Sequence, residues 1–408
     1  MKKAIHLSTI LCWCIPVLSH ADESFHLRDG DRVVLLGSTL IEREQRSAYW
    51  ETALTIAWPD SNIKFRNLAW SGDNVFGESR LAFDINNMAL GLKRMVDLVI
   101  AEKPTVIIIC YGMNESFAGD AGLAQFSAGY EKLLDSLSIC KARIVLMSPN
   151  PFEAVSSIKD RVEELNKNLA HYRDAIKTLA DKRHLIFADL FDAMGNGSKT
   201  EPKYTENGMH LSQFGYWKSV PNLKIALGIR VKPIESVSIA ENKLTTDLAS
   251  PIVHRIEKSQ FEATLHCLPM PSSPAFWQNA TRKELSGRSM IIKNISLVGD
   301  QMLKIDGQKC TSASASRWSE GVVIQSGPDL DQAEKLRQAI IQKNQLYFYR
   351  WRPQNETYLF GFRKHEQGRN AKEIAEFDPL IAKAEAEIAR LRKPNKHLYE
   401  FTINAKEH

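Results

Sequence analysis

VVLLGST, residues 33–39, carries the pattern from which the fold can be predicted: an apolar, partly β-branched run ends at a glycine, and two hydroxyl side chains follow. Short runs that are apolar throughout are typical of strands buried on both faces of a parallel sheet. Four similar runs follow, at 63–68, 106–110, 144–147 and 185–188. Helical patterns lie between them, at 43–57, 86–102, 123–137 and 161–180. This alternation predicts a five-stranded parallel sheet with helices on both faces, from about residue 32 to residue 229.

Small polar segments follow the predicted strands. Gly37-Ser38-Thr39, Gly72 and Gly112-Met113-Asn114 come after the first three strands, and Asn207-Gly208-Met209-His210 follows the last strand at a longer distance. Taken singly, these are ordinary turn glycines and a surface histidine. Ligands of parallel sheets bind beyond the carboxyl ends of the strands. The shared placement of the four segments therefore predicts one site at that edge.

In order and chemistry the four segments resemble the blocks of the SGNH (GDSL-type) hydrolase superfamily, which read Gly-Asp-Ser, Gly, Gly-x-Asn and Asp-x-x-His. The resemblance implies a three-layer α/β/α, flavodoxin-like fold and cleavage of an ester bond. From the residues themselves we expect no cofactor and no metal. The resemblance makes Thr39 the nucleophile, His210 the general base and Asn207 the residue that orients the base. It makes Gly72 and Asn114 donors to the oxyanion that forms during acyl transfer.

Two catalytic positions depart from the family pattern. Thr39 replaces serine, and its Cβ methyl group restricts the side chain and crowds the attack trajectory. Ser38 offers a second hydroxyl one residue earlier. Asn207 replaces aspartate; it can accept a hydrogen bond but supplies no charge, and the same change costs a serine protease about four orders of magnitude in rate. Three other carboxylates are candidates for the missing acid: Glu206, Asp73 and Glu115.

Three hypotheses about function follow from this pattern. The chain is a secreted esterase or carbohydrate deacetylase, with Thr39 or Ser38 as nucleophile and His210 as base. Alternatively, it is a catalytically impaired protein that binds acylated or carbohydrate ligands in the same pocket. In the third hypothesis, residues of the C-terminal region carry the chemistry. The expected substrate of the first is a small-molecule or carbohydrate ester.

The segment from Tyr347 to Gly368 combines aromatic rings, arginines and amides at high density. Such side chains suit the recognition of sugars or anions. We predict that this segment returns to the carboxyl edge of the sheet and helps to wall the pocket with Arg350, Asn355 and His365. The alternative is a docking segment whose aromatic rings are buried. His365 and the adjacent glutamate are too few ligands to indicate a metal site.

The N-terminus has a charged start, a short apolar stretch and small residues before Ala21. This pattern predicts a secretory signal peptide over residues 1–21 and a secreted or periplasmic location, without a stable membrane span. The net charge of +5 is spread along the chain in both signs, which argues against a nucleic-acid partner.

The alternation of strands and helices ends after residue 231, which predicts further domains. We expect the α/β domain to cover 22–231, a small β-rich module to cover 232–326, and a helical C-terminal segment, 327–408, to pack back on the α/β domain. Nothing in the sequence resembles a nucleotide-binding glycine loop or a zinc-binding cysteine pattern. A disulfide between Cys267 and Cys310 is compatible with an oxidising compartment.

Overall fold

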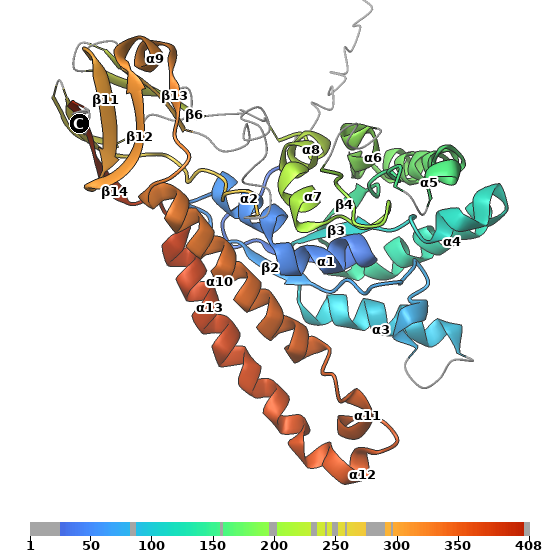
Figure 1. The fold of residues 1–408 in the computed structure, drawn as a ribbon. Coiled ribbons are helices and arrows are strands. Elements are labelled where there is room, and N and C mark those ends of the chain that lie inside the picture. The colour runs from blue at the N-terminus through green and yellow to red at the C-terminus, as the bar shows by residue number, and fades with distance from the viewer. Residues whose placement is uncertain are drawn as a thin grey trace, which may run out of the picture.

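The structure is a computed structural model of the chain (Figure 1). It describes residues 25–81, 87–155, 158–195, 202–229, 235–240, 243–246, 252–257, 259–274, 290–294 and 297–403. The predicted signal peptide lies outside the described residues. No helix in the described part of the chain is long and apolar enough to span a membrane.

The α/β domain is built on a parallel sheet, and its strand order is β2-β1-β3-β4-β5. The five predicted strands are confirmed, with bounds that differ by at most one residue. They are β1 (Arg32–Gly37), β2 (Lys64–Asn67), β3 (Val106–Cys110), β4 (Arg143–Met147) and β5 (Ile186–Ala188). The order places β1 and β3 at the centre, where the sheet is buried on both faces.

Alternate side chains of β1 enter two separate cores. Val33 and Leu35 belong to a core with helix residues such as Trp50, whereas Val34 and Leu36 belong to the core on the opposite face. This is the period of two that a strand buried on both sides must show. The first core is covered by α1 (Thr39–Ser47), α2 (Tyr49–Ala57), α7 (Gln213–Lys218) and α8 (Val220–Ala226). The second is covered by α3 (Met88–Ala101), α4 (Gly119–Leu137) and α5 (Val162–Arg183), and the predicted three-layer fold is confirmed.

The helix predicted over 43–57 is two helices, because the backbone breaks at Ala48. Ala48 has a left-handed conformation with φ of 51°, which ends α1 and begins α2. The buried carboxylate of Glu44 accepts hydrogen bonds from the N–H groups of Trp50 and Glu51 at 2.8 and 3.2 Å. These contacts satisfy backbone donors that the first turn of a helix leaves open.

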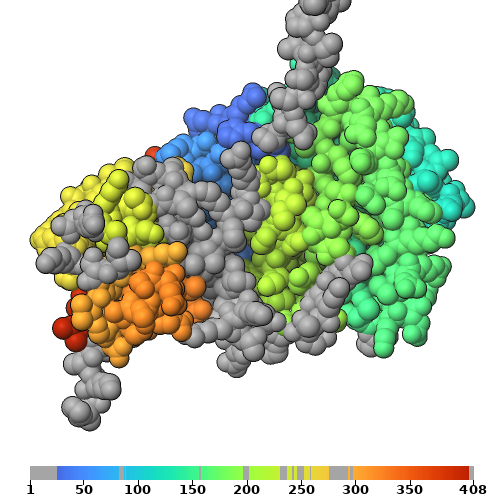
Figure 2. Space-filling view, turned by 90° about the horizontal axis from the view of Figure 1, so that it is seen from above, coloured from blue at the N-terminus to red at the C-terminus, as the bar shows by residue number. Residues whose placement is uncertain are grey.

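The β-rich module contains two sheets that share one core. One sheet has the order β13-β10-β6-β7 and the other has the order β12-β11-β14-β9-β8. Their strands are β6 (Glu235–Ala240), β7 (Lys243–Thr246), β8 (Ile252–Ile256), β9 (Gln260–Thr264), β10 (Met290–Asn294), β11 (Asp300–Ile305), β12 (Gln308–Ser314), β13 (Val322–Val323) and β14 (Lys396–Ile403). Val237, Phe261, Leu303 and Phe401 meet between the sheets. Figure 2 shows this module at one end of the molecule, away from α5.

The end of the chain corrects the predicted domain plan. Strand β14 lies between β9 and β11, so residues 396–403 complete a module that the sequence pattern ended at residue 326. The C-terminal segment is therefore not helical throughout. The disulfide between Cys267 and Cys310, which the sequence left open, is not formed in the structure.

A long helical hairpin joins the two parts of the molecule. It consists of α10 (Pro328–Trp351) and α13 (Phe377–Leu391), with α11 (Glu356–Leu359) and α12 (Lys364–Gln367) at its far end (Figure 1). Lys343 of α10 is fully buried and donates to Glu51 of α2 at 2.7 Å and to the carbonyl of Phe65 at 3.1 Å. Asn344 donates to the other oxygen of Glu51 at 2.9 Å. This buried polar network fixes the hairpin against the sheet domain.

We expect Lys343→Met to lower the free energy of unfolding by about 3–5 kcal/mol, because it leaves the buried carboxylate of Glu51 without its cation. Urea denaturation followed by tryptophan fluorescence measures the effect. Lys335→Met, at an exposed position of the same helix, is the matched control and should change little. Equal stabilities of the two variants would show that the network does not dock the hairpin.

Candidate active site

Backbone hydrogen bonds join the first three loops at the carboxyl edge of the sheet. The N–H of Ser38, after β1, donates to the carbonyl of Cys110 at the end of β3, at 3.3 Å. The N–H of Trp70, after β2, donates to the carbonyl of Gly37 at 3.0 Å. The predicted residues Ser38, Thr39, Gly72 and Asn114 therefore lie at one edge.

The two hydroxyl groups after β1 have different surroundings. Ser38 is buried, and its Oγ accepts a hydrogen bond from Asn114 Nδ2 at 2.9 Å. Thr39 begins α1 and is partly exposed. Its Oγ1 accepts a hydrogen bond from the N–H of Gly72 at 3.1 Å. Of the two, Thr39 is the hydroxyl that a ligand can reach.

The expected oxyanion donors already have acceptors inside the protein. Asn114 Nδ2 donates to the carbonyl of Asp73 at 2.8 Å in addition to Ser38. An amide NH₂ group has two protons, so both are used. The N–H of Gly72 is engaged by Thr39. A substrate oxygen would have to replace the oxygens of Thr39 and Ser38 to use these donors.

Glu115 ties the second and third loops together. One carboxylate oxygen accepts from the N–H of Val75 at 3.0 Å and the other from the N–H of Gly112 at 2.9 Å. Part of the residue is exposed, but its carboxylate is turned inward onto these two groups. Burial raises the pKa of Glu115 to about 7, against the opposing effect of the backbone N–H groups.

The loop that carries His210 is held by contacts with the segment after β4. The buried carboxylate of Glu153 accepts from the N–H and the hydroxyl of Thr205 at 2.9 and 2.7 Å. Gly208 has φ of +86°, and a Cβ there would lie 2.4 Å from Ile158 Cδ1. Only glycine is therefore compatible with this turn.

Two contacts set this loop beside α1. Tyr216, after the loop, donates its hydroxyl to the carbonyl of Leu40 at 2.7 Å. Arg43 of α1 forms an ion pair with Glu206 at 2.9 Å. His210 and Thr39 thus lie on neighbouring segments, although no hydrogen bond joins their side chains in the described part of the chain. Catalytic hydrogen bonds are often long in unliganded enzymes and shorten when substrate binds.

The Asn207 amide controls the protonation of the His210 ring. Its Oδ1 accepts from the N–H groups of Met209 and His210 at 3.2 and 2.9 Å, while its Nδ2 faces His210 Nδ1 at 3.2 Å. Turning the amide round would set its NH₂ group against two N–H donors, so this orientation is the favourable one. His210 Nδ1 must then accept, and the neutral ring carries its proton on Nε2. In a working triad the proton sits on Nδ1 and Nε2 is the base.

The pKa of His210 is lowered, first by burial and then by the positive charge of Arg43, while Glu206 opposes the shift. The ring is therefore neutral at pH 7. This neutral ring can take a proton at Nε2 only if its own proton first moves to Nδ1, the nitrogen that faces Asn207.

None of the three alternative carboxylates forms a hydrogen bond with the His210 ring in the described part of the chain. Glu206 pairs with Arg43. Asp73 is buried and accepts from Arg80 Nε at 2.7 Å and from the Tyr111 hydroxyl at 3.1 Å. The Glu115 oxygens are used by backbone N–H groups.

The predicted wall residues of the C-terminal segment have other partners. Arg350 pairs with Asp378 of α13 at 2.8 Å, and Asn355 donates to Gln367 at 3.4 Å. The side chain of His365 is 74% exposed. The contact with the carboxyl edge is made by Arg352 instead, whose guanidinium lies 3.4 Å from the ring centre of Trp70. The density of arginine and aromatic residues indicated this segment, but the sequence could not show which arginine faces the sheet.

Comparison with known proteins identifies the class. Residues 37–218 match the family model of the GDSL-like lipase/acylhydrolase family. No curated protein matches the chain at a significant level. The α/β domain of this chain belongs to the SGNH (GDSL-like) hydrolase superfamily, whose members are ester hydrolases. Its sheet order and the position of its motifs agree with this assignment.

Several solved structures match the chain at low sequence identity. A gut microbial diltiazem-metabolizing enzyme is 17% identical with a TM-score of 0.68, and the alignment covers 93% of this chain and 99% of that one. The described modules therefore recur together in that structure. A catalytic mutant of an acetylxylan esterase from Geobacillus stearothermophilus is 17% identical with a TM-score of 0.39, covering 50% of this chain and 99% of the esterase. A GDSL-like lipase from Bacteroides thetaiotaomicron is 18% identical with a TM-score of 0.34, covering 48% and 87%.

We expect Asn207→Asp to reverse the tautomer of His210, because a carboxylate oxygen accepts from Nδ1–H where the amide donates. Nitrogen NMR shifts should report an Nε2–H ring in the wild type and an Nδ1–H ring in the variant. The added charge should raise the pKa of His210 by about 1 unit or more. Asn207→Ala is the control and should not produce the Nδ1–H form. The same tautomer in all three proteins would contradict the prediction.

The raised pKa of Glu115 predicts how stability depends on pH. The folded state holds this proton up to about pH 7 and the unfolded chain up to about pH 4.5, so its contribution is complete below pH 4.5 and lost as pH rises through 7. Glu115→Gln should remove roughly 1–3 kcal/mol of that pH dependence. Urea denaturation at pH 4.5, 6 and 8 measures it. Glu163→Gln, on the exposed face of α5, should keep the wild-type slope.

Proposed function

We propose that this protein is an ester hydrolase of low turnover, acting on a small-molecule or carbohydrate ester, with Thr39 as nucleophile and His210 as base. The observation that carries the proposal is the 3.1 Å contact between the Thr39 hydroxyl and the Gly72 N–H. It brings a reachable hydroxyl and an oxyanion donor together at the edge where the family binds its substrates.

The proposed reaction has two steps. Thr39 Oγ1 forms a bond to the acyl carbon while its proton passes to His210 Nε2, and the ester C–O bond breaks as the alcohol leaves with that proton. Water then attacks the acyl-threonine ester, and its proton passes to His210 Nε2. The bond between the acyl carbon and Thr39 Oγ1 breaks, which releases the carboxylic acid, and the proton returns to Thr39. The first step requires the free Nε2 that the Asn207 amide disfavours. This is why we propose low turnover.

The second candidate function is binding of an acylated ligand without turnover. One observation favours it: Nδ2 of Asn207 lies opposite His210 Nδ1, so the resting ring presents Nε2–H as a donor. A donor at this place can hold an ester carbonyl or a sugar hydroxyl but cannot take the proton of Thr39.

Hydrolysis of short-chain nitrophenyl esters by the purified protein separates the two functions. We expect measurable turnover in the wild type, a fall to background in Thr39→Ala, and an increase of about 10²–10⁴-fold in kcat for Asn207→Asp, since the corresponding change in a serine protease costs about 10⁴. Asn207→Ala is the control and should show no increase.

Activity that is unchanged in both Thr39→Ala and Ser38→Ala would exclude each as the nucleophile. The binding function would be favoured if the wild type and the Asn207→Asp variant were both inactive while an ester analogue still bound.

A further inference from the structure

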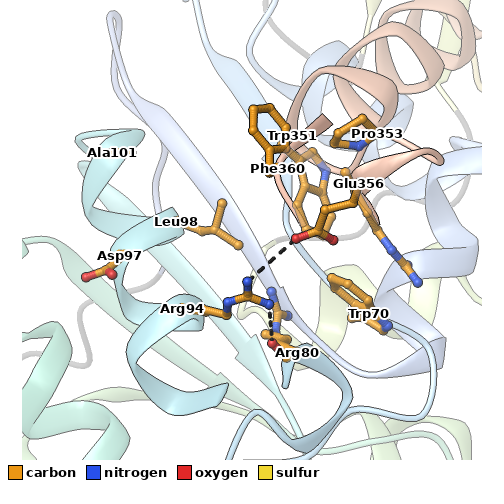
Figure 3. A pocket seen from close by; sticks show the side chains of 11 residues that line it. Trp70, Arg80, Arg94, Asp97, Leu98, Ala101, Trp351, Pro353, Glu356 and Phe360 are labelled. Atoms are coloured by element: carbon orange, nitrogen blue, oxygen red, sulfur yellow. Dashed lines mark hydrogen bonds and ion pairs between the residues drawn. The ribbon is translucent and has the colours of Figure 1, made fainter. Parts of the chain in front are cut away.

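A second pocket lies beside the candidate active site, where the hairpin meets the α/β domain. Its volume is about 330 Å³, which is within the range of small-molecule sites. Trp70 and α3 form one side, and the end of α10 with α11 forms the other (Figure 3). None of its residues was assigned a role by the ester-cleaving chemistry proposed above.

Two arginine side chains in this pocket have no carboxylate within hydrogen-bond distance, although Arg94 Nη1 donates to the backbone carbonyl of Arg80 at 3.0 Å. Arg352 is half-buried and stacks on Trp70, yet its nearest carboxylate, Glu42, is 3.9 Å away. Arg94 Nη2 is 3.7 Å from Glu356, and Figure 3 shows these two side chains facing one another. Both distances exceed that of a hydrogen bond. Burial lowers the pKa of Arg352, and the nearby positive charge of Arg80 adds to the shift.

Two buried donors beside them have no partner among the described residues. They are Arg80 Nη1, on a side chain that is 1% exposed, and the indole Nε1 of Trp351. The nearby carboxylates are already engaged by other nitrogens. Asp73 accepts from Nε of the same Arg80, and Asp97 pairs with Lys93 at 2.6 Å. A buried donor without an acceptor costs free energy, so the pocket is short of acceptor oxygens.

The rest of the lining is apolar. The rings of Trp70, Trp351 and Phe360 contribute, together with Leu98 and Pro353. Flat apolar walls with guanidinium groups at one side suit a ligand with a ring system and an anionic oxygen group.

We propose that this pocket binds an aromatic carboxylate, with the carboxylate at Arg352 and Arg94 and the ring between Trp351 and Leu98. We further assign it as the anchor for the non-reacting part of the ester substrate, a use that rests on the function proposed above. The connection is short: Glu42, which faces Arg352, lies one helical turn after Thr39 and accepts the N–H of Ser71, next to Gly72.

Binding of 2-naphthoate to the full chain, measured by isothermal titration calorimetry, tests the pocket without any need for turnover. 2-Naphthylmethanol has the same rings without the charge, and we expect it to bind at least 10-fold more weakly. Arg352→Gln should weaken naphthoate binding by about 10-fold or more, the usual effect of losing a charged hydrogen bond. Trp351→Phe, which removes the indole donor and keeps a ring, should weaken it a few-fold.

Arg350→Gln is the matched control, since Arg350 lies two residues away and pairs with Asp378 outside the pocket. It should leave naphthoate affinity unchanged. Three outcomes would each overturn the proposal. The first is equal affinity for naphthoate and naphthylmethanol, and the second is tighter binding of a neutral disaccharide such as xylobiose. The third is an equal loss of naphthoate affinity in Arg350→Gln and Arg352→Gln.

Thr39→Ala separates this inference from the proposed function. Naphthoate should bind this variant as tightly as it binds the wild type. If naphthoate binds and no ester is cleaved, the pocket stands and the hydrolase function fails. If nitrophenyl esters are cleaved and naphthoate does not bind, the pocket proposal fails alone.

Discussion

The central strand β1 imposes the main constraint on this molecule, because both of its faces are buried. Val33 and Leu35 enter one core, and Val34 and Leu36 enter the other. No polar side chain can be placed along such a strand at low cost, so the polar groups gather where it ends. Ser38 and Thr39 stand at that end, and the backbone bond from Ser38 to Cys110 aligns them with the loop that carries Asn114.

The side-chain amide of Asn207 then decides which nitrogen of the His210 ring carries the proton. The backbone N–H groups of Met209 and His210 hold Asn207 Oδ1, which leaves only the NH₂ group for the histidine ring. Aspartate could accept from both sides, whereas asparagine must donate to one of them. The fold of an acylhydrolase is thus retained while the direction of one hydrogen bond is reversed. The other donors are similarly turned inward, toward Ser38, Thr39 and Asp73.

The hairpin adds one wall of the second pocket, which the α/β domain does not form alone. Lys343 and Asn344 fix α10 through Glu51, and this docking places Arg352 over Trp70. Lys343 and Asn344, which dock the hairpin, are therefore on the same helix as Trp351, which lines the second pocket. Arg352 then lies 3.9 Å from its nearest partner carboxylate, Glu42 of α1, which is too far for a hydrogen bond.

The sheet, its five strands and the edge of the candidate site could be predicted from the sequence, since these follow from apolar periodicity and from residues adjacent in the chain. The sequence also identified Thr39, Gly72, Asn114 and His210 as candidates. Only the tertiary structure decided that Ser38 is buried, that β14 completes the β-rich module, and that Arg352 rather than Arg350, Asn355 or His365 reaches the carboxyl edge. These outcomes depend on contacts between residues far apart in the chain and on the direction of individual hydrogen bonds, neither of which local patterns encode.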